Sequence, residues 1–416
     1  MITAETDTRV MFLSALARAL ARFGEDSDSI ERDLVGCAAR LGLPGQFYAT
    51  PTMVMASFGS DEQPRTILLR IHEGRIDLEA LDRVNVVRKG VMSGATTAPQ
   101  ALAELNLIAA APARFPWVVR VLASGLGAGS FAIFLGGEWQ AFVAAVPVGL
   151  VVGMIVLASQ RYARLQLLGG LLGAFAAAVT TLAVGHVIRH FSLPSVALAG
   201  LILLLPGLAI TTGVSELAAR QLSSGTARLA GATVTLVNLG VGSFLGFAII
   251  ARLHWVPRTL AVASHPSALA VVVAVLATSV ALLVSTNART RDWLLTLAAV
   301  VVALAGARFG AWLFGATLGV VVAAFALGVC ANGYARLRQR PAALMLIPGL
   351  AVLVPGALGL RGVSEFLRSA AGGVNVLVSV VIIAAGLVVG LLVADALLPA
   401  RGADAPAAEA NGDSRV

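Results

Sequence analysis

The same pattern, a Pro-Gly pair followed by Gly-Val-Ser-Glu, occurs twice in a strongly apolar chain. PGLAITTGVSE runs from Pro206 to Glu216, and PGALGLRGVSE runs from Pro355 to Glu365, 149 residues later (355 − 206). Proline inside a helix removes a backbone hydrogen bond and costs about 3 kcal/mol. In lipid, such a break persists only where protein or water satisfies the freed backbone groups. Breaks at matched positions in two halves indicate the binding site of a transporter.

The composition is that of a membrane protein. Of 416 residues, 58% are hydrophobic and only 12% are charged, with a mean hydropathy of +0.88. The formal charge of +8 comes almost entirely from arginine, since Lys89 is the only lysine. Most of the arginines lie at the ends of apolar runs, which indicates anchors at a lipid bilayer surface and not a nucleic-acid partner.

Ten apolar runs follow Pro116, and most are long enough to cross a bilayer as helices. The offset of 149 residues relates the first five runs to the last five, and five spans per half would invert the second half relative to the first. Glycine pairs at GxxxG spacing predict close helix packing, within one molecule or between subunits of a homo-oligomer. The ten runs are 116–135, 139–158, 165–187, 193–211, 229–251, 267–286, 292–307, 309–331, 341–360 and 374–397.

The order of parts predicts a polytopic α-helical membrane protein with a 5+5 inverted repeat behind a small cytoplasmic α+β domain. That domain contains a helix with Asp28 and Glu31 in a capping-box pattern, strands at 46–57 and 65–72, and two further helices. The last two helices are 78–91 and 98–110, the second capped by Thr97. The expected domains are residues 1–113, the membrane halves 114–255 and 256–398, and a disordered tail, 399–416.

The distribution of arginines and the polar first residues predict a cytoplasmic N-terminus. With the N-terminus inside, short inner loops hold nine arginines and outer loops hold six. The first residues lack the plan of a cleaved signal peptide. Cys37 and Cys330 lie in regions of different polarity, so neither a disulfide nor a metal cluster is expected.

The Pro-Gly pairs are the first candidates for lining a substrate site. In the first half the pair is Pro206-Gly207. In the second half the matched pair is either Pro348-Gly349 or Pro355-Gly356, because flanking residues support both alignments. The structural alternative is a kink that only helps packing.

Two glutamates and a few polar residues complete the candidate site. Glu216 and Glu365 either couple or gate transport, or lie at the interface paired with arginine. Asn238 is open to interhelical hydrogen bonding or substrate contact. Three hydroxyl residues between the first break and its acid could bind a small polar solute: Thr211, Thr212 and Ser215.

The arrangement resembles the threonine/serine exporter family in its fused two-half form. The matching elements are ATPT at 49–52, RTILLR at 65–70, LDRVNVV at 81–87 and the Pro-Gly of the fourth span. The resemblance implies export of threonine, serine or similar solutes across a bacterial cell membrane, drawing on the proton gradient, or of a dicarboxylate such as succinate. It implies no cofactor. The family leads us to expect an acid, often aspartate, after the Pro-Gly; Glu216 is the nearest in this chain.

Two other classes of protein fit the sequence less well than a transporter. A membrane-bound hydrolase using the N-terminal domain has little support, because the five histidines are scattered and HExxH, GxSxG and CxxC are absent from the sequence. A sensor or scaffold would not need two matched Pro-Gly breaks. The sequence therefore predicts a secondary transporter without catalytic or metal-binding residues.

Overall fold

The computed structural model describes residues 4–43, 45–59, 65–71, 74, 76–166, 168–257, 266–353, 360 and 370–399. The chain forms two compact units. The first contains residues 1–111, 325–346 and 390–416, and the second contains residues 112–324 and 347–389. Pro355, Gly356 and Glu365 lie outside the described residues.

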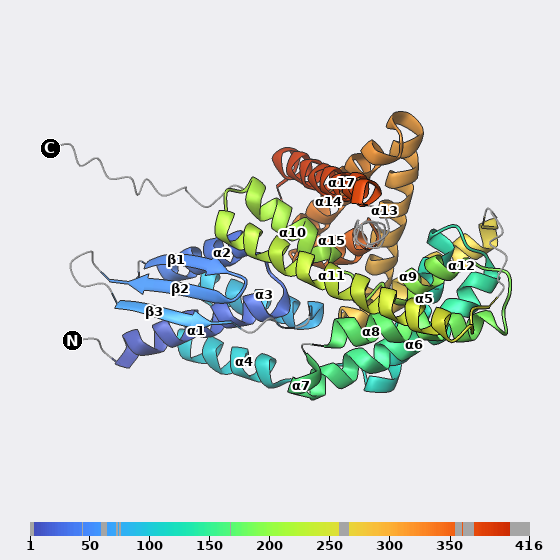
Figure 1. Ribbon diagram of the computed structural model, residues 1–416. Helices are drawn as coiled ribbons and strands as arrows, with labels where there is room; N and C mark the ends of the chain where they lie inside the picture. Colours follow the sequence, from blue (N-terminus) through green and yellow to red (C-terminus); the bar gives the residue numbers. More distant parts are fainter. Residues whose placement is uncertain are drawn as a thin grey trace. The chain divides into compact units, whose positions relative to one another are not determined.

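An α+β domain begins the first unit, with three antiparallel strands in the order β1-β2-β3 and four helices (Figure 1). The segment predicted as one strand at 46–57 is a hairpin, because Pro51 and Thr52 form its turn. Thr50 closes this turn by donating its Oγ1 hydrogen to the Met53 carbonyl at 3.1 Å. The elements are α1 (Ala4–Phe23), α2 (Ser27–Arg40), β1 (Gly45–Thr50), β2 (Met53–Phe58), β3 (Arg65–Arg70), α3 (Leu78–Ser93) and α4 (Ala98–Ala110).

Local capping explains where these helices begin. Thr97 and Gln100 form the predicted capping box of α4. For α2 the predicted cap is wrong: Asp26 accepts the hydrogen bond from the Ser29 backbone, and Asp28 instead pairs with Arg32 at 2.9 Å. Asp is a favoured N-cap residue because its carboxylate satisfies a free N–H of the first turn.

Helix α1 has no counterpart among the predicted elements, although it supplies much of the domain core. Phe12, Leu13, Leu16 and Leu20 are buried and recur at helical spacing. This apolar spacing predicts a helix, but the polar residues at the start of the chain made the pattern harder to recognise.

An ion pair joins the N-terminal domain to the connection between two later helices, and this connection belongs to the same unit. Arg340 follows α14 (Ala316–Arg338) and precedes α15 (Ala343–Leu353). Its guanidinium donates to both carboxylate oxygens of Asp82, at 3.1 and 3.0 Å, while their side chains are 19% and 4% exposed. Lys89 also donates to the Gln339 carbonyl. Such a two-point contact fixes orientation as well as charge.

The second unit is a helical bundle whose segments are those expected of a multi-pass membrane protein. Among the described residues, seven helices are long and apolar enough to span a bilayer, or eight counting one bent pair, and two apolar helices are shorter. The count of ten spans and the inverted repeat stay predictions. The remaining elements are α5 (Trp117–Phe134), α6 (Trp139–Arg161), α7 (Ala163–Gln166), α8 (Gly169–Gly185), α9 (Leu193–Gly200), α10 (Gly207–Ala218), α11 (Leu222–Arg252), α12 (Ala268–Ser285), η1 (Thr290–Asp292), α13 (Trp293–Phe314) and α17 (Ala370–Leu397).

Two of the predicted helix boundaries are wrong. The boundary expected at Arg308 lies at Gly315, which has φ +85°, and Arg308 is inside α13. An arginine near a helix end can extend its charge to the membrane surface, so it need not mark a loop. Helix α11 begins seven residues before the apolar run predicted at 229–251.

Glycines allow the helices of the bundle to approach closely. A Cβ on Gly149 of α6 would lie 2.6 Å from the Ala128 Cβ of α5. On α11, a Cβ on Gly242 would lie 2.3 Å from the Leu171 carbonyl oxygen of α8, and one on Gly246 would lie 2.7 Å from the Ala178 Cβ. The GxxxG spacing at 242 and 246 therefore serves packing within one molecule.

The α8–α11 contact predicts that alanine substitutions at two glycines of α11 change the stability of the protein by very different amounts. Gly242→Ala should destabilise the protein by about 1–3 kcal/mol, because the methyl group would meet backbone. Gly231→Ala is the matched control, since a Cβ there meets nothing within 4 Å. Thermal unfolding in detergent, followed by circular dichroism, measures both; equal melting temperatures for the two variants would contradict this packing.

Candidate functional site

The fourth span of the second unit is broken beside Pro206, at one of the breaks predicted from the sequence. Helix α9 ends at Gly200, a turn follows, and Pro206 is the N-cap of α10. The pieces Leu193–Gly200 and Ile202–Ala218 are bent by 50°. Because proline has no N–H, it fits the first positions of a helix and not its interior.

Protein packs around part of this break. Leu201 is fully buried, and Leu198 and Ile210 on either side belong to the bundle core. The Leu201 carbonyl accepts hydrogen bonds from the backbone of Leu204 at 2.8 Å and Leu205 at 3.2 Å. These turns satisfy backbone groups that a break would otherwise leave without partners in lipid.

A tight turn at the end of α10 sets the position of the next helix. Arg220 has a left-handed backbone with φ +63°. Its N–H donates to the Leu217 carbonyl at 3.0 Å, and the Gln221 N–H donates to the Glu216 carbonyl at 2.8 Å. This hydrogen-bond pair is the Schellman motif, which reverses the chain within a few residues.

The helices after this turn approach each other through two glycines. A Cβ on Gly225 of α11 would lie 2.7 Å from the Gly213 carbonyl oxygen of α10, and one on Gly213 would lie 3.1 Å from the Gly225 carbonyl oxygen. Any larger side chain would separate the helices. Gly213 begins the repeated Gly-Val-Ser-Glu pattern, so close helix approach is one reason for its first residue.

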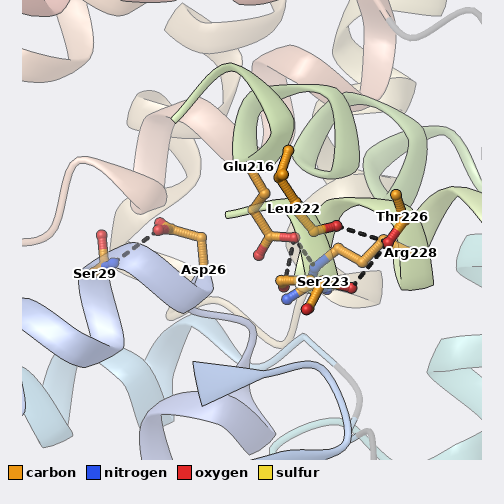
Figure 2. A network of polar contacts seen from close by, with 8 residues as sticks. Asp26, Ser29, Glu216, Leu222, Ser223, Thr226 and Arg228 are labelled. Carbon is orange, nitrogen blue, oxygen red and sulfur yellow. Dashed lines mark hydrogen bonds and ion pairs between the residues drawn. The ribbon is translucent and has the colours of Figure 1, made fainter. Parts of the chain in front are cut away.

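Glu216 lies between these two helices and is held by two residues of α11 (Figure 2). Its Oε2 accepts a hydrogen bond from the Ser224 hydroxyl at 2.7 Å and from the Arg228 Nε at 2.9 Å. The Glu216 side chain is 2% exposed and that of Arg228 is 21% exposed. The site is therefore a buried carboxylate with a charge-assisted partner that reaches toward solvent.

The two interpretations of Glu216 from the sequence each describe part of this geometry. The residue is paired with an arginine, as the interfacial interpretation expected, but it is buried within helices and not in a loop. The arginine is Arg228, and not Arg220, which forms the turn. Sequence reasoning missed Arg228 because it precedes the apolar run, yet it lies within the first part of α11.

The other candidate residues lie at different distances along the chain from the cluster of Glu216, Ser224 and Arg228. Thr211 is buried and donates to the Gly207 carbonyl at 3.3 Å, while Thr212 and Ser215 are half-buried on α10. Asn238 is half-buried on α11, ten residues beyond Arg228, or about 15 Å along the helix axis. The α10 hydroxyls thus share a short helix with Glu216, and Asn238 does not.

In the second half, Pro348 and Gly349 lie inside α15, which continues through them. The described part of this helix contains no break at the first of the two Pro-Gly pairs. The alternative pair, Pro355-Gly356, and Glu365 lie outside the described residues. Which pair corresponds to Pro206 stays a prediction.

No group of three or more metal-ligating side chains occurs within the described ranges. Neither cysteine forms a disulfide; Cys37 is buried and Cys330 is exposed. Arg120 of α5 donates to the Gln160 side chain of α6 at 2.9 Å.

The Glu216–Arg228 pair predicts a non-additive effect on stability. Arg228→Gln should cost about 3–5 kcal/mol, because it leaves a buried carboxylate without its counter-charge. Glu216→Gln should cost less, since Arg228 is partly exposed, and the double variant should regain much of the Arg228→Gln loss. Thermal unfolding of the three variants in detergent measures the cycle; strictly additive losses would contradict a coupled pair.

Comparison with known families covers nearly the whole chain. A family profile described as "Putative threonine/serine exporter" matches residues 11–250. A second, described as "Threonine/Serine exporter, ThrE", matches residues 267–397. No solved structure matches the chain.

The chain spans less than half the length of the curated fungal relatives that it matches. An uncharacterized protein of Schizosaccharomyces pombe is 23% identical over 86% of this chain and 44% of its own length. Pheromone-regulated membrane protein 10 of Debaryomyces hansenii is 29% identical over 57% of this chain and 24% of its own length. The Saccharomyces cerevisiae protein of that name is 28% identical over 59% of this chain and 32% of its own length.

The first profile alone covers more than half of the chain, and the residues that it matches include most of the α+β domain and the broken fourth span. The chain thus has the helices of a multi-pass membrane protein and belongs to the threonine/serine exporter family.

Proposed function

We propose that the protein exports small polar metabolites from the cytoplasm, with threonine and serine as the principal substrates and the proton gradient as the driving force. Membership of the exporter family is the observation that carries this proposal. The broken span supports it, because irregular backbone at membrane depth is tolerated where it lines a protein-covered or water-filled path. We place the N-terminal domain on the cytoplasmic side of the membrane, as the arginine distribution predicts.

Glu216 is the residue we assign to coupling. A buried carboxylate on a short helix that begins at a break can exchange a proton or release its arginine when the helix moves. The hydroxyls of Thr211, Thr212 and Ser215 are on the same helix and are suited to a solute that carries its own hydroxyl group. Export would then follow alternating access of one half against the other.

Efflux from liposomes tests the proposed transport. Vesicles containing the full chain are loaded with labelled threonine, serine or succinate, and efflux is followed with and without an imposed pH gradient. We expect protein-dependent efflux of threonine and serine that the gradient accelerates. Efflux of succinate alone would favour the dicarboxylate alternative, and absence of flux for all three with folded protein would contradict transport.

Substitution of Glu216 separates coupling from packing. Glu216→Gln keeps the size and a hydrogen-bonding oxygen but cannot carry a proton. We expect about tenfold or greater loss of gradient-driven efflux, the size of effect that loss of one charged hydrogen bond gives. Glu104→Gln, an exposed acid of α4, is the control. Equal gradient-driven efflux by wild type and Glu216→Gln would show that the glutamate is only structural.

The N-terminal domain is assigned a regulatory role through the α14–α15 connection. Helices α14 and α15 each continue from the first unit into the second, and Arg340 between them is held by Asp82. A change in the domain is therefore transmitted along the chain to spans of the membrane unit.

Asp82→Asn tests this role. It should weaken the hold on Arg340 and change the maximal rate of threonine efflux several-fold, by removing one charge from a buried pair. Asp28→Asn, at an exposed pair with Arg32, serves as the control. Unchanged efflux by Asp82→Asn, with an unchanged melting temperature, would exclude regulation through this contact.

A further inference from the structure

A second polar site lies at the start of the broken span, at the far end from Glu216. A cavity of about 380 Å³ is formed by the loop between α5 and α6 and the segment that leads into α9. Its polar lining comes from Glu138, Gln140, His190, Ser192 and Ser195, and Phe191 contributes an apolar wall. This volume falls at the lower end of the range for small-ligand sites, about 300–1,000 Å³.

A hydrogen-bonded turn immediately before Glu138 sets the position of its backbone. Gly136 adopts φ +90°, and the Gly137 N–H donates to the Ala132 carbonyl at 3.0 Å, which closes α5 with a Schellman turn. A Cβ on Gly137 would lie 2.8 Å from the Ala132 carbonyl oxygen, so the turn needs glycine there. Glu138 then serves as the N-cap of α6 without using its side chain as a cap. Its half-buried carboxylate is thus held at the cavity by a rigid turn.

Other lining residues supply hydrogen-bond donors to the same cavity. Ser192 is the N-cap of α9, and Ser195 donates its hydroxyl hydrogen to the Ser192 hydroxyl at 3.1 Å. His190 can donate from its imidazole, and Gln140 from its amide. A carboxylate and several hydrogen-bond donors that line one cavity complement a molecule that has both an ammonium and a carboxylate group.

The cavity lies at the beginning of the broken span, whose later part contains Glu216. Ser195 and Glu216 lie twenty-one residues apart on the broken span, with Pro206 between them. Twenty-one residues of straight α-helix would measure about 30 Å, and the 50° bend shortens this end-to-end distance. One polar site therefore lies toward each end of the same interrupted span.

We infer that this cavity, lined by Glu138, His190 and Ser192, is a binding site for a small free α-amino acid at the end of the bundle opposite Glu216. The Glu138 carboxylate accepts the ammonium group, and His190 and Ser192 donate to the carboxylate. Phe191 and the limited volume favour a short side chain. The inference rests on the proposed function for its choice of ligand, and under the proposed orientation the site faces the outside.

Trp139 provides a local signal for the test, since it follows Glu138 directly, is 39% exposed and packs edge-on against Phe142. The full chain in lipid nanodiscs is titrated with L-threonine while tryptophan fluorescence and calorimetric heat are recorded. We expect saturable heat and a fluorescence change that Trp139→Phe removes without removing the heat. Threonine amide, which lacks the carboxylate, and 3-hydroxybutyrate, which lacks the ammonium group, should bind at least about tenfold more weakly.

Substitutions locate the binding and separate this inference from transport. Glu138→Gln and His190→Gln should each weaken threonine binding about tenfold or more, whereas Glu104→Gln should not. Wild-type binding by both cavity variants, or a fluorescence change that persists in Trp139→Phe, would overturn the assignment even if efflux is observed. Cavity-dependent binding without efflux would uphold the site and contradict the transporter proposal instead.

Discussion

The hydrocarbon interior of a membrane offers no partner to a backbone N–H or carbonyl group, and this constraint governs the fourth span. The regular hydrogen bonding of that span stops after Gly200 and resumes at Pro206, the N-cap of α10, so the groups between them must be satisfied by turns and covered by protein. The turn at Leu201 and the buried residues around it meet part of that requirement. Close packing at glycines is what brings enough protein to the break: Leu204 reaches the position that a Cβ on Gly173 of α8 would occupy, at 2.7 Å.

Interrupting the span also produces a helix short enough to be positioned by its ends. Helix α10 has twelve residues, begins at the break and ends in the turn at Arg220. Glu216 is in its last turn and is tied to α11 through Ser224 and Arg228. Because removal of one buried charge partner is costly, α10 and α11 are coupled more strongly than apolar contact alone would couple them. A movement at the break is therefore transmitted to α11.

Local chemistry made part of this arrangement predictable. Pro206 predicted the break, Thr97 and Gln100 predicted the start of α4, and the glycine spacing at 242 and 246 predicted close packing. Arg228 was not predicted as the partner of Glu216, since that contact depends on the turn geometry and on a helix that begins before the apolar run. The cavity at Glu138 depends on loops far apart in the sequence, and no local pattern marks it.

The repeated Gly-Val-Ser-Glu pattern has a packing role and a chemical role. Gly213 permits the close approach of α11, and Glu216 uses that approach to reach Ser224 and Arg228. At the same offset of 149 residues in the sequence, Gly373 corresponds to Ser224 and Leu377 corresponds to Arg228. The second half thus repeats the glycine and the acid but not the hydroxyl or the arginine at the matched positions. An assignment of coupling to Glu216 therefore does not extend to Glu365 from the repeated pattern alone.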